Sequence, residues 1–189
     1  MLYINDQLQN LDLSAALHTI SKQRREQALR FKYEHGRRLS VAAYLLLKHA
    51  LLEEEGIAEN PVFIYSEHGK PSIEGHPELY FSLSHCKEAV ACVLSRRPVG
   101  VDIESLGRYR ESVARYSMND DELLCIHQSD RPDVAFTRLW TMKESLLKLQ
   151  GSGITNQIKD VLREVSSSWF STVEQLDKNY IYTVCEQLE

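Results

Sequence analysis

The sequence predicts an α+β fold in which two similar halves follow one another along the chain. The length of 189 residues allows one domain or two small lobes. Hydrophobic residues make up 43% of the chain and charged residues 26%, a balance typical of a globular protein with a buried core. The third observation is the order of the expected elements, because a strand, helices and further strands occur twice in succession.

The first half is expected to begin with a strand, continue through helices and end in strands. Apolar residues at helical spacing predict helices over residues 14–31 and 37–55, separated at Gly36 and ended by Gly56. Runs rich in aliphatic and aromatic residues, bounded by turn formers, predict strands over residues 2–4, 62–65, 79–83 and 89–94.

The second half is expected to repeat this order. Helices are predicted over residues 119–127, with Asn119 as the N-cap, and 134–150, ended by Gly151. Strands are predicted over residues 99–103, 158–165, 169–176 and 180–185, although alternation is poor in 158–165. The halves meet near Arg96-Arg97-Pro98, which predicts lobes of residues 1–97 and 98–189. No residue-level repeat accompanies the repeated order of elements.

Charge and composition exclude several classes of protein. The formal net charge of −5 argues against a general electrostatic grip on nucleic acid. Uncharged stretches stay short of the ~18 apolar residues of a membrane span, and the first residues lack the basic segment of a signal peptide. The four cysteines lack CxxC spacing, as expected of reduced thiols in a cytoplasmic protein.

Two carboxylates lie close together on an expected strand, in Gly100-Val101-Asp102-Ile103-Glu104. Because side chains alternate along a strand, Asp102 and Glu104 point to the same face. Paired oxygens of this kind suit a hard cation. For an isolated pair, a solvent-exposed strand end or a cap for the next element is the more common explanation.

A third carboxylate occurs in the expected helix 134–150. Glu144 and Lys148 are four residues apart and share one face, as in an ordinary surface salt bridge. The apolar neighbours of this pair place it at the edge of a packed cleft: Leu139, Trp140, Leu146 and Leu147. Three carboxylates can bind Mg²⁺, and a lysine beside them can neutralise phosphate.

Basic side chains gather in the first half of the chain. Residues 22–38 hold seven Lys and Arg against two Glu, a pattern that attracts a polyanion or forms a solvated basic face. Lys70, in Gly69-Lys70-Pro71, and Ser84-His85 at a strand end add possible phosphate donors. Each of these features alone is more often structural.

Taken together, these segments resemble the 4′-phosphopantetheinyl transferase superfamily, and specifically its longer, two-lobed Sfp-type branch. The matching motifs span residues 69–148 in the order expected for the family: Gly69-Lys70-Pro71, Phe81-Ser82-Leu83-Ser84-His85, Gly100-Val101-Asp102-Ile103-Glu104 and Trp140-Thr141-Met142-Lys143-Glu144-Ser145-Leu146-Leu147-Lys148. The last two motifs in combination carry most of the resemblance.

The resemblance implies a pseudo-twofold, two-lobed α+β fold in which each lobe is a small antiparallel sheet packed on helices. Coenzyme A would bind in the cleft between the lobes. The implied reaction is Mg²⁺-dependent transfer of 4′-phosphopantetheine from coenzyme A to a serine of an apo acyl or peptidyl carrier protein, with release of adenosine 3′,5′-bisphosphate. The implied enzyme is active as a monomer, without nucleic acid or membrane partners.

The resemblance also implies roles for individual residues. The Mg²⁺ ligands would be Asp102, Glu104 and Glu144, with Glu144 also the base that activates the serine. Lys148 would stabilise charge on the diphosphate, so that the catalytic residues are Asp102, Glu144 and Lys148. Contacts to coenzyme A would come from the remaining matched positions and from Lys148: Arg24, Ser40, Lys70, Ser84 and His85.

Two positions depart from the pattern of the family. Arg24 stands where a lysine would match more closely, and its planar fork differs from a compact ammonium. Leu39 precedes Ser40, where an arginine is common, and Arg38 lies one position earlier. The acidic run Asp120-Asp121-Glu122 cannot be aligned uniquely and is assigned no role in the site.

Two other functions remain open from the residues alone. A Mg²⁺-dependent nucleotide or coenzyme A hydrolase would use the same carboxylates with water as the nucleophile. A non-catalytic scaffold would bind coenzyme A or a carrier protein without turnover. Release of bisphosphate without a carrier would indicate the hydrolase, and binding without Mg²⁺-dependent turnover would indicate the scaffold.

Overall fold

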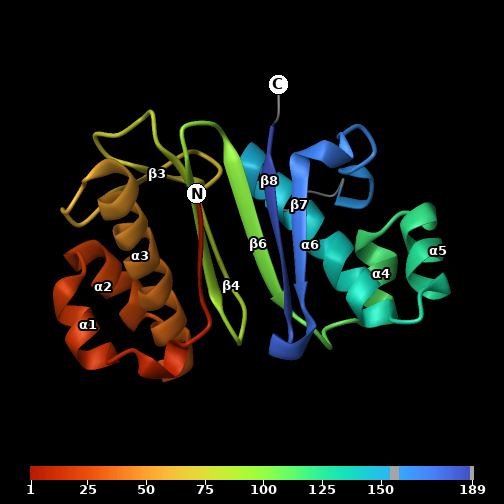
Figure 1. Cartoon of the computed structure of the whole chain (residues 1–189), viewed down its shortest axis with the longest axis horizontal. Coiled ribbons are helices and arrows are strands. Elements are labelled where there is room, and N and C mark those ends of the chain that lie inside the picture. Colours follow the sequence, from red (N-terminus) through yellow and green to blue (C-terminus); the bar gives the residue numbers. More distant parts are fainter. Residues whose placement is uncertain (154–157, 188–189) are drawn as a thin grey trace.

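A computed structural model of the chain describes residues 1–153 and 158–187 (Figure 1). In the first half, the helices and strands are β1 (Leu2–Asn5), α1 (Leu13–Thr19), α2 (Lys22–Leu29), α3 (Glu34–Glu55), β2 (Phe63–Tyr65), β3 (Pro71–Ile73), β4 (Tyr80–His85) and β5 (Val90–Ser95). In the second half they are β6 (Val99–Ser105), α4 (Glu111–Ser117), α5 (Asp120–Gln128), α6 (Pro132–Gln150), β7 (Phe170–Gln175) and β8 (Tyr180–Glu186).

Two three-stranded antiparallel sheets form the centre of the molecule. Their strand orders are β1-β5-β4 and β6-β8-β7, so in each sheet the first strand of the half pairs with the last. The predicted α+β class with small antiparallel sheets is therefore confirmed. The two halves of the chain repeat the same strand topology. The hairpin β2-β3 has no counterpart among the described residues of the second half. The lobe boundary between residues 97 and 98 stays a prediction.

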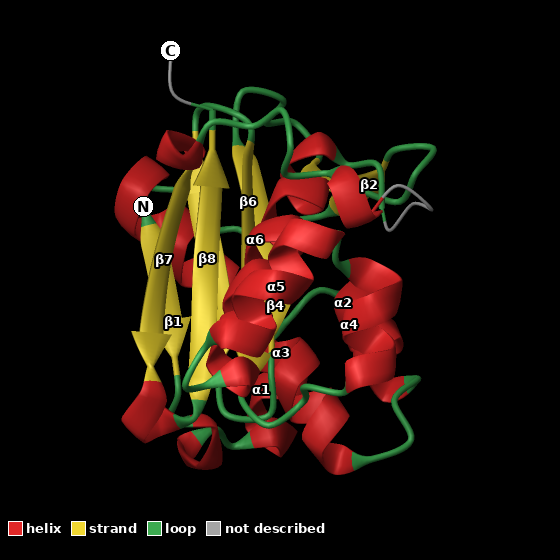
Figure 2. Cartoon of the chain, turned by 90° about the vertical axis from the view of Figure 1, so that its right-hand side faces the viewer, coloured by secondary structure: helices red, strands yellow, loops and turns green. Residues whose placement is uncertain are grey.

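Helices cover the sheets from two sides. Figure 1 shows α1–α3 on one side of the strands and α4–α6 on the other, and Figure 2 shows α5 and α6 in front of the strands. The longest helix of the first half, α3, packs Val41, Tyr44 and Leu47 into a core with Phe81 and Leu94. None of the helices in the described ranges combines the length and hydrophobicity of a membrane span.

A second core joins the halves. Ala91 and Val93 of β5 pack with Val101 and Ile103 of β6, and all four side chains are buried. This apolar contact, together with residues from β1 and β8, makes the two sheets pack against each other. The end of β4 and the middle of β6 are thereby held side by side.

The local signals for helix ends are confirmed. Gly56 and Gly151 end α3 and α6 with positive φ angles of 69° and 71°, which glycine adopts without steric cost. Asn119 caps α5, because its side chain accepts a hydrogen bond from the backbone N–H of Glu122, and the Glu122 side chain accepts one from Asn119 in return.

Other local predictions were wrong. The single helix expected over residues 14–31 is two helices, because Ser21 leaves the helical conformation and its hydroxyl accepts from the backbone N–H of Arg24. Gly36 lies inside α3 and does not break it. The strands and helices also include β3 and α4, which the sequence pattern did not indicate.

The strand expected over residues 158–165 is absent. Residues Ile158–Asp160 form a 3₁₀ helix that is followed by turns. Ile158 is buried, and its carbonyl group accepts a hydrogen bond from the Lys143 ammonium at 2.8 Å. A lysine from α6 therefore binds this backbone in place of a neighbouring strand.

Candidate active site

The central strand β6 and helix α6 bring the predicted carboxylates together. Asp102 is buried in β6, and Glu104 lies two residues further on the same strand. Helix α6 lies directly against β6 because Gly100 has no side chain: a Cβ atom there would lie 1.9 Å from the carbonyl oxygen of Ser145. This close approach places Glu144 and Lys148 beside the carboxylates of β6.

Asp102 is bound by groups from both halves. Its Oδ1 accepts hydrogen bonds from the hydroxyl group of Ser84 at 2.8 Å and from the ammonium group of Lys148 at 2.6 Å. Its Oδ2 atom is buried and has no hydrogen-bond partner. One buried oxygen of Asp102 is therefore available to a further ligand.

Strands β4 and β6 are connected through serine side chains. The Ser82 hydroxyl accepts from the backbone N–H of Val101 at 3.1 Å, and the Ser84 hydroxyl accepts from that of Ile103 at 3.3 Å. Ser84 also accepts from Lys148 at 2.9 Å. In this structure, the Ser84 hydroxyl thus orients Asp102 and Lys148 and lies within their network.

Glu104 and Glu144 lie in an environment unfavourable to negative charge. Burial, then the nearby charge of Asp102, raises the pKa of Glu104, while the Arg108 guanidinium opposes this. Burial and the charges of Asp102 and Glu104 also raise the pKa of Glu144, although Lys148 opposes them. The half-buried carboxylate of Glu144 thus remains partly uncompensated, since its Oε1 atom is buried and has no hydrogen-bond partner.

These residues fit a hard divalent cation in their chemistry. Carboxylate oxygens are the ligands that Mg²⁺ prefers, and two of them, Asp102 Oδ2 and Glu144 Oε1, are buried and unpartnered. Within residues 1–153 and 158–187, no three His, Cys, Asp or Glu side chains form a ready-arranged metal site. Lys148 instead contacts Asp102, and Arg108 contacts Glu104.

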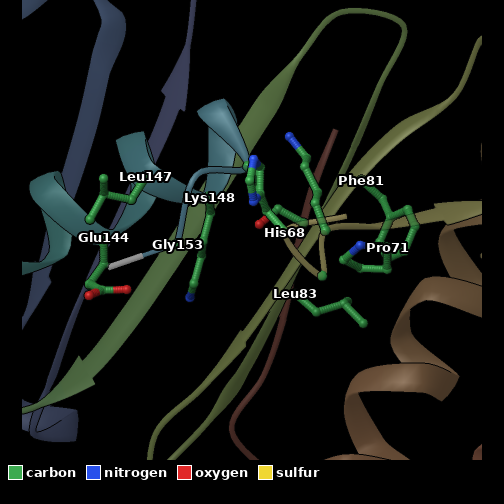
Figure 3. A pocket seen from close by; sticks show the side chains of 12 residues that line it. His68, Pro71, Phe81, Leu83, Glu144, Leu147, Lys148 and Gly153 are labelled. Carbon is green, nitrogen blue, oxygen red and sulfur yellow. The ribbon is translucent and has the colours of Figure 1, made fainter. Parts of the chain in front are cut away.

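A cavity of about 340 Å³ lies next to this network. Figure 3 shows Glu144 and Lys148 extending from α6 at one side of it, with Pro71, Phe81 and Leu83 at the other. Both halves of the chain therefore line it. Its mixture of apolar walls and charged groups suits an elongated ligand with a phosphate-bearing end.

Lys70 lines the same cavity from the β2-β3 hairpin. Its ammonium donates to the backbone carbonyl of Leu149 at 2.6 Å, and its aliphatic stem lies against Gly151. Burial lowers the pKa of Lys70. The side chain thus binds the C-terminal end of α6, where the helix dipole favours a positive charge.

Arg24 and Lys148 place two positive charges near His85. Desolvation of the His85 ring where it packs against the protein at the end of β4, then the charges of Lys148 and Arg24, lowers the pKa of His85. Arg24 lies 5.8 Å from the ring centroid of Tyr44 and donates to the backbone carbonyl of Ser40 at 2.8 Å. Its Nε atom is buried without a partner, and burial lowers the pKa of Arg24.

Several arginines of the basic segment 22–38 donate hydrogen bonds to backbone carbonyls within the fold. Arg25 and Arg37 donate to backbone carbonyls at 2.6 and 2.9 Å, and Arg38 donates to two others. Arg24 is the member of this segment whose charge reaches His85. The count of basic residues thus overstated the part of this segment that faces the site.

Lys143 is a buried charged residue that the sequence analysis left without a role. Its ammonium is fully buried and contacts Glu122 at 2.8 Å and the backbone carbonyls of Ile158 and Lys159 at 2.8 and 2.7 Å. Glu122 belongs to the acidic run that was assigned no role, and helical spacing alone does not pair it with a lysine from another helix. Arg108 was also missed, since its only sequence signal is its position four residues after Glu104.

Comparison with known proteins identifies the class of enzyme. Residues 98–187, which contain β6 and α6, match the 4′-phosphopantetheinyl transferase superfamily. Over 143 residues, the chain is 32% identical to the 4′-phosphopantetheinyl transferase AcpT of Salmonella typhi, covering 72% of this chain and 70% of AcpT. The chain belongs to the 4′-phosphopantetheinyl transferase superfamily, and the resemblance drawn from its motifs is confirmed.

Relatives from Bacillus extend the similarity along the chain. The 4′-phosphopantetheinyl transferase Sfp of Bacillus subtilis is 24% identical over 200 residues, which cover 97% of this chain and 89% of Sfp. The 4′-phosphopantetheinyl transferase psf-1 of Bacillus pumilus is 27% identical over 161 residues, covering 84% of this chain and 69% of psf-1. The similarity therefore includes the first half, where Lys70 and Ser84 lie.

Proposed function

We propose that this enzyme transfers 4′-phosphopantetheine from coenzyme A to a serine hydroxyl of an apo acyl or peptidyl carrier protein, with Mg²⁺, and releases adenosine 3′,5′-bisphosphate. The observation that carries the proposal is the meeting of Asp102, Glu144 and Lys148 between β6 and α6, beside a cavity lined by both halves. Membership in the superfamily supports the class of reaction.

Asp102, Glu104 and Glu144 would hold the Mg²⁺ ion. The buried, unpartnered oxygens Asp102 Oδ2 and Glu144 Oε1 support this assignment, because a bound cation would satisfy both atoms. When bound, the ion neutralises charge on phosphate oxygens and on the leaving group.

Glu144 would take the proton of the carrier serine. It lines the cavity beside Lys148, and a positioned base typically contributes about 10²–10⁴-fold to a rate. The serine oxygen forms a bond to the phosphorus nearer the pantetheine, and the bond from that phosphorus to the leaving bisphosphate breaks. Lys148 would stabilise the negative charge that develops on the leaving phosphate.

Arg24 and Lys148, together with the neighbouring ring of His85, would bind the 3′-phosphate and diphosphate of coenzyme A. The charges of Lys148 and Arg24, which contribute after burial to the lowered pKa of His85, support this role, because they place two cations near the ring. Lys70 would contact coenzyme A from the cavity wall, while Ser84 orients Asp102 and Lys148. Ser40 would contribute through its carbonyl, which holds Arg24.

The expected setting is a cytoplasmic monomer whose partners are coenzyme A and a carrier protein, without nucleic acid or membrane. The cavity lies within one copy of the chain, which supports activity as a monomer. Sedimentation of the active protein tests this expectation. Activity that requires an oligomer would contradict it.

Intact-protein mass spectrometry tests the reaction directly. A panel of apo acyl and peptidyl carrier proteins is incubated with the enzyme and coenzyme A, with Mg²⁺ or with excess chelator. A Mg²⁺-dependent gain of one phosphopantetheine is expected on at least one carrier. Free bisphosphate without carrier modification would instead favour the hydrolase, and coenzyme A binding without any turnover would favour the scaffold.

Variants test the roles of individual groups. Asp102→Asn should reduce transfer by at least about 10²-fold, the range for loss of a group that stabilises developing charge. Lys148→Ala should also reduce transfer but retain Mg²⁺ binding, because an ammonium is not a metal ligand. Glu53→Gln is the control, since Glu53 lies half exposed on α3 and forms its ion pair with His49, at 4.0 Å. Transfer by Asp102→Asn at the rate of Glu53→Gln would refute the assignment.

A further inference from the structure

Both oxygens of Glu104 are engaged by side chains outside the predicted site. Oε2 accepts from the guanidinium of Arg108 at 2.5 Å, and Oε1 accepts from the indole N–H of Trp140 at 3.3 Å. Asp102 is engaged in a similar way by Lys148. In this structure, a basic side chain therefore stands against each of the two carboxylates of β6.

Basic side chains contact Asp102 and Glu104 because several negative carboxylates lie close together around β6. After burial, the charges of neighbouring carboxylates contribute to the raised pKa of Glu104 and Glu144, so Asp102, Glu104 and Glu144 lie near one another. Two cationic side chains offset most of this charge and leave one carboxylate, Glu144, without an equivalent contact. A divalent cation that engages all three carboxylates must compete with these side chains for the same oxygens.

The position of Arg108 allows its guanidinium to release Glu104 when a cation binds. It follows the turn at Gly107, where φ is 79°, and its side chain is 66% exposed, so its guanidinium can be solvated when released. A cavity of about 330 Å³ adjoins Glu104, Arg108 and Trp140 and leaves room for the movement. An exposed ion pair of this kind changes an equilibrium by about two- to fivefold.

We propose that Arg108 is an internal counter-ion that holds Glu104 in the metal-free protein and is displaced when a divalent cation engages Glu104. The inference rests on the proposed function only in taking Glu104 as a ligand of the cation. It assigns Arg108 a positioning role, outside the reacting groups. Removal of Arg108 should therefore tighten cation binding, because the competitor for Glu104 is lost.

A matched pair of variants separates this contact from a general change of charge. Arg108→Gln removes the pair with Glu104, and Arg115→Gln removes an equivalent pair with Glu111. Both arginines bind a glutamate four residues earlier, and their side chains are 66% and 67% exposed. Each variant removes one positive charge, so a difference between them isolates the contact with Glu104.

Binding of Mn²⁺ to the protein alone is measured by electron paramagnetic resonance, without coenzyme A or carrier. Arg108→Gln should bind Mn²⁺ about two- to fivefold more tightly than Arg115→Gln and the wild type. The difference should shrink in 1 M salt, where the Debye length is about 3 Å. Equal or weaker binding by Arg108→Gln, or no binding by any of the three proteins, overturns the inference.

Trp140 provides a second readout, because its indole N–H contacts the same carboxylate. In a Trp169→Phe background, Trp140 is the remaining tryptophan, and Mn²⁺ or Mg²⁺ should change its emission at concentrations that follow the binding isotherm. Unchanged emission at saturation overturns displacement at Glu104. Carrier transfer is measured separately. If the wild type transfers nothing to any carrier but Arg108→Gln still binds Mn²⁺ more tightly, the proposed function is refuted and this inference stands.

Discussion

Substitution of Gly100 by alanine tests the idea that a missing side chain sets the position of α6. The new Cβ atom would lie 1.9 Å from the carbonyl oxygen of Ser145 and 2.6 Å from the backbone nitrogen of Leu149. A C–H···O contact is normally about 3.3 Å, so α6 must retreat by about 1.4 Å. Both neighbouring atoms belong to backbone, and no rotamer change can relieve the clash.

The expected cost is at the upper end of the range for overpacking, about 3 kcal/mol. For a chain of this length, a loss of this size lowers the melting temperature by roughly 6–12 °C. The same retreat moves Glu144 and Lys148 away from Asp102, and a misplacement of about 1 Å can reduce a rate by about 10²-fold. Gly100→Ala should therefore lose transfer activity even at temperatures where it remains folded.

Urea denaturation and the carrier-transfer assay measure the two effects, with Gly36→Ala as the control. A Cβ atom at Gly36 would lie 2.9 Å from the ring of Phe31, a side chain that is 41% exposed and can turn away. Because Gly36 lies in α3, alanine should gain up to about 1 kcal/mol of helix propensity. If the free energy of unfolding of Gly100→Ala lies within about 0.5 kcal/mol of the wild-type value and the variant transfers at the normal rate, the reasoning is refuted.

Two further variants test the buried charges. Lys143→Met should destabilise the fold by about 3–5 kcal/mol in urea denaturation, because Glu122 loses its buried cation. The double variant with Glu122→Gln should recover part of this loss. A Lys143→Met variant as stable as the wild type would contradict the prediction. Glu144→Gln should stabilise the metal-free protein at neutral pH. The raised pKa of Glu144 means that the folded state binds more protons than the unfolded state above about pH 4.3, so stability falls as pH rises through this window. Melting temperatures in chelator between pH 4 and 8 should converge at the acid end, and a less stable Glu144→Gln at pH 7 would contradict the sign.

Local chemistry in the sequence determined the elements that carry the site. Glycine ends α3 and α6 because it adopts a positive φ angle, and Asn119 begins α5 because its side chain accepts from the backbone. The alternation of a strand placed Asp102 and Glu104 on one face before any partner was known. These features depend on residues within a few positions of one another, so a sequence is sufficient to read them.

Tertiary structure decided which partner each charged group obtains. Helical spacing pairs Lys148 with Glu144, yet the ammonium contacts Asp102, because the packing of α6 on Gly100 brings β6 within 2.6 Å of it. Likewise, Lys143 binds the backbone of Ile158, in a 3₁₀ helix that lies where a strand was expected. These contacts join segments far apart in the chain, and their geometry depends on how the two sheets and α6 pack, which no local pattern of residues encodes.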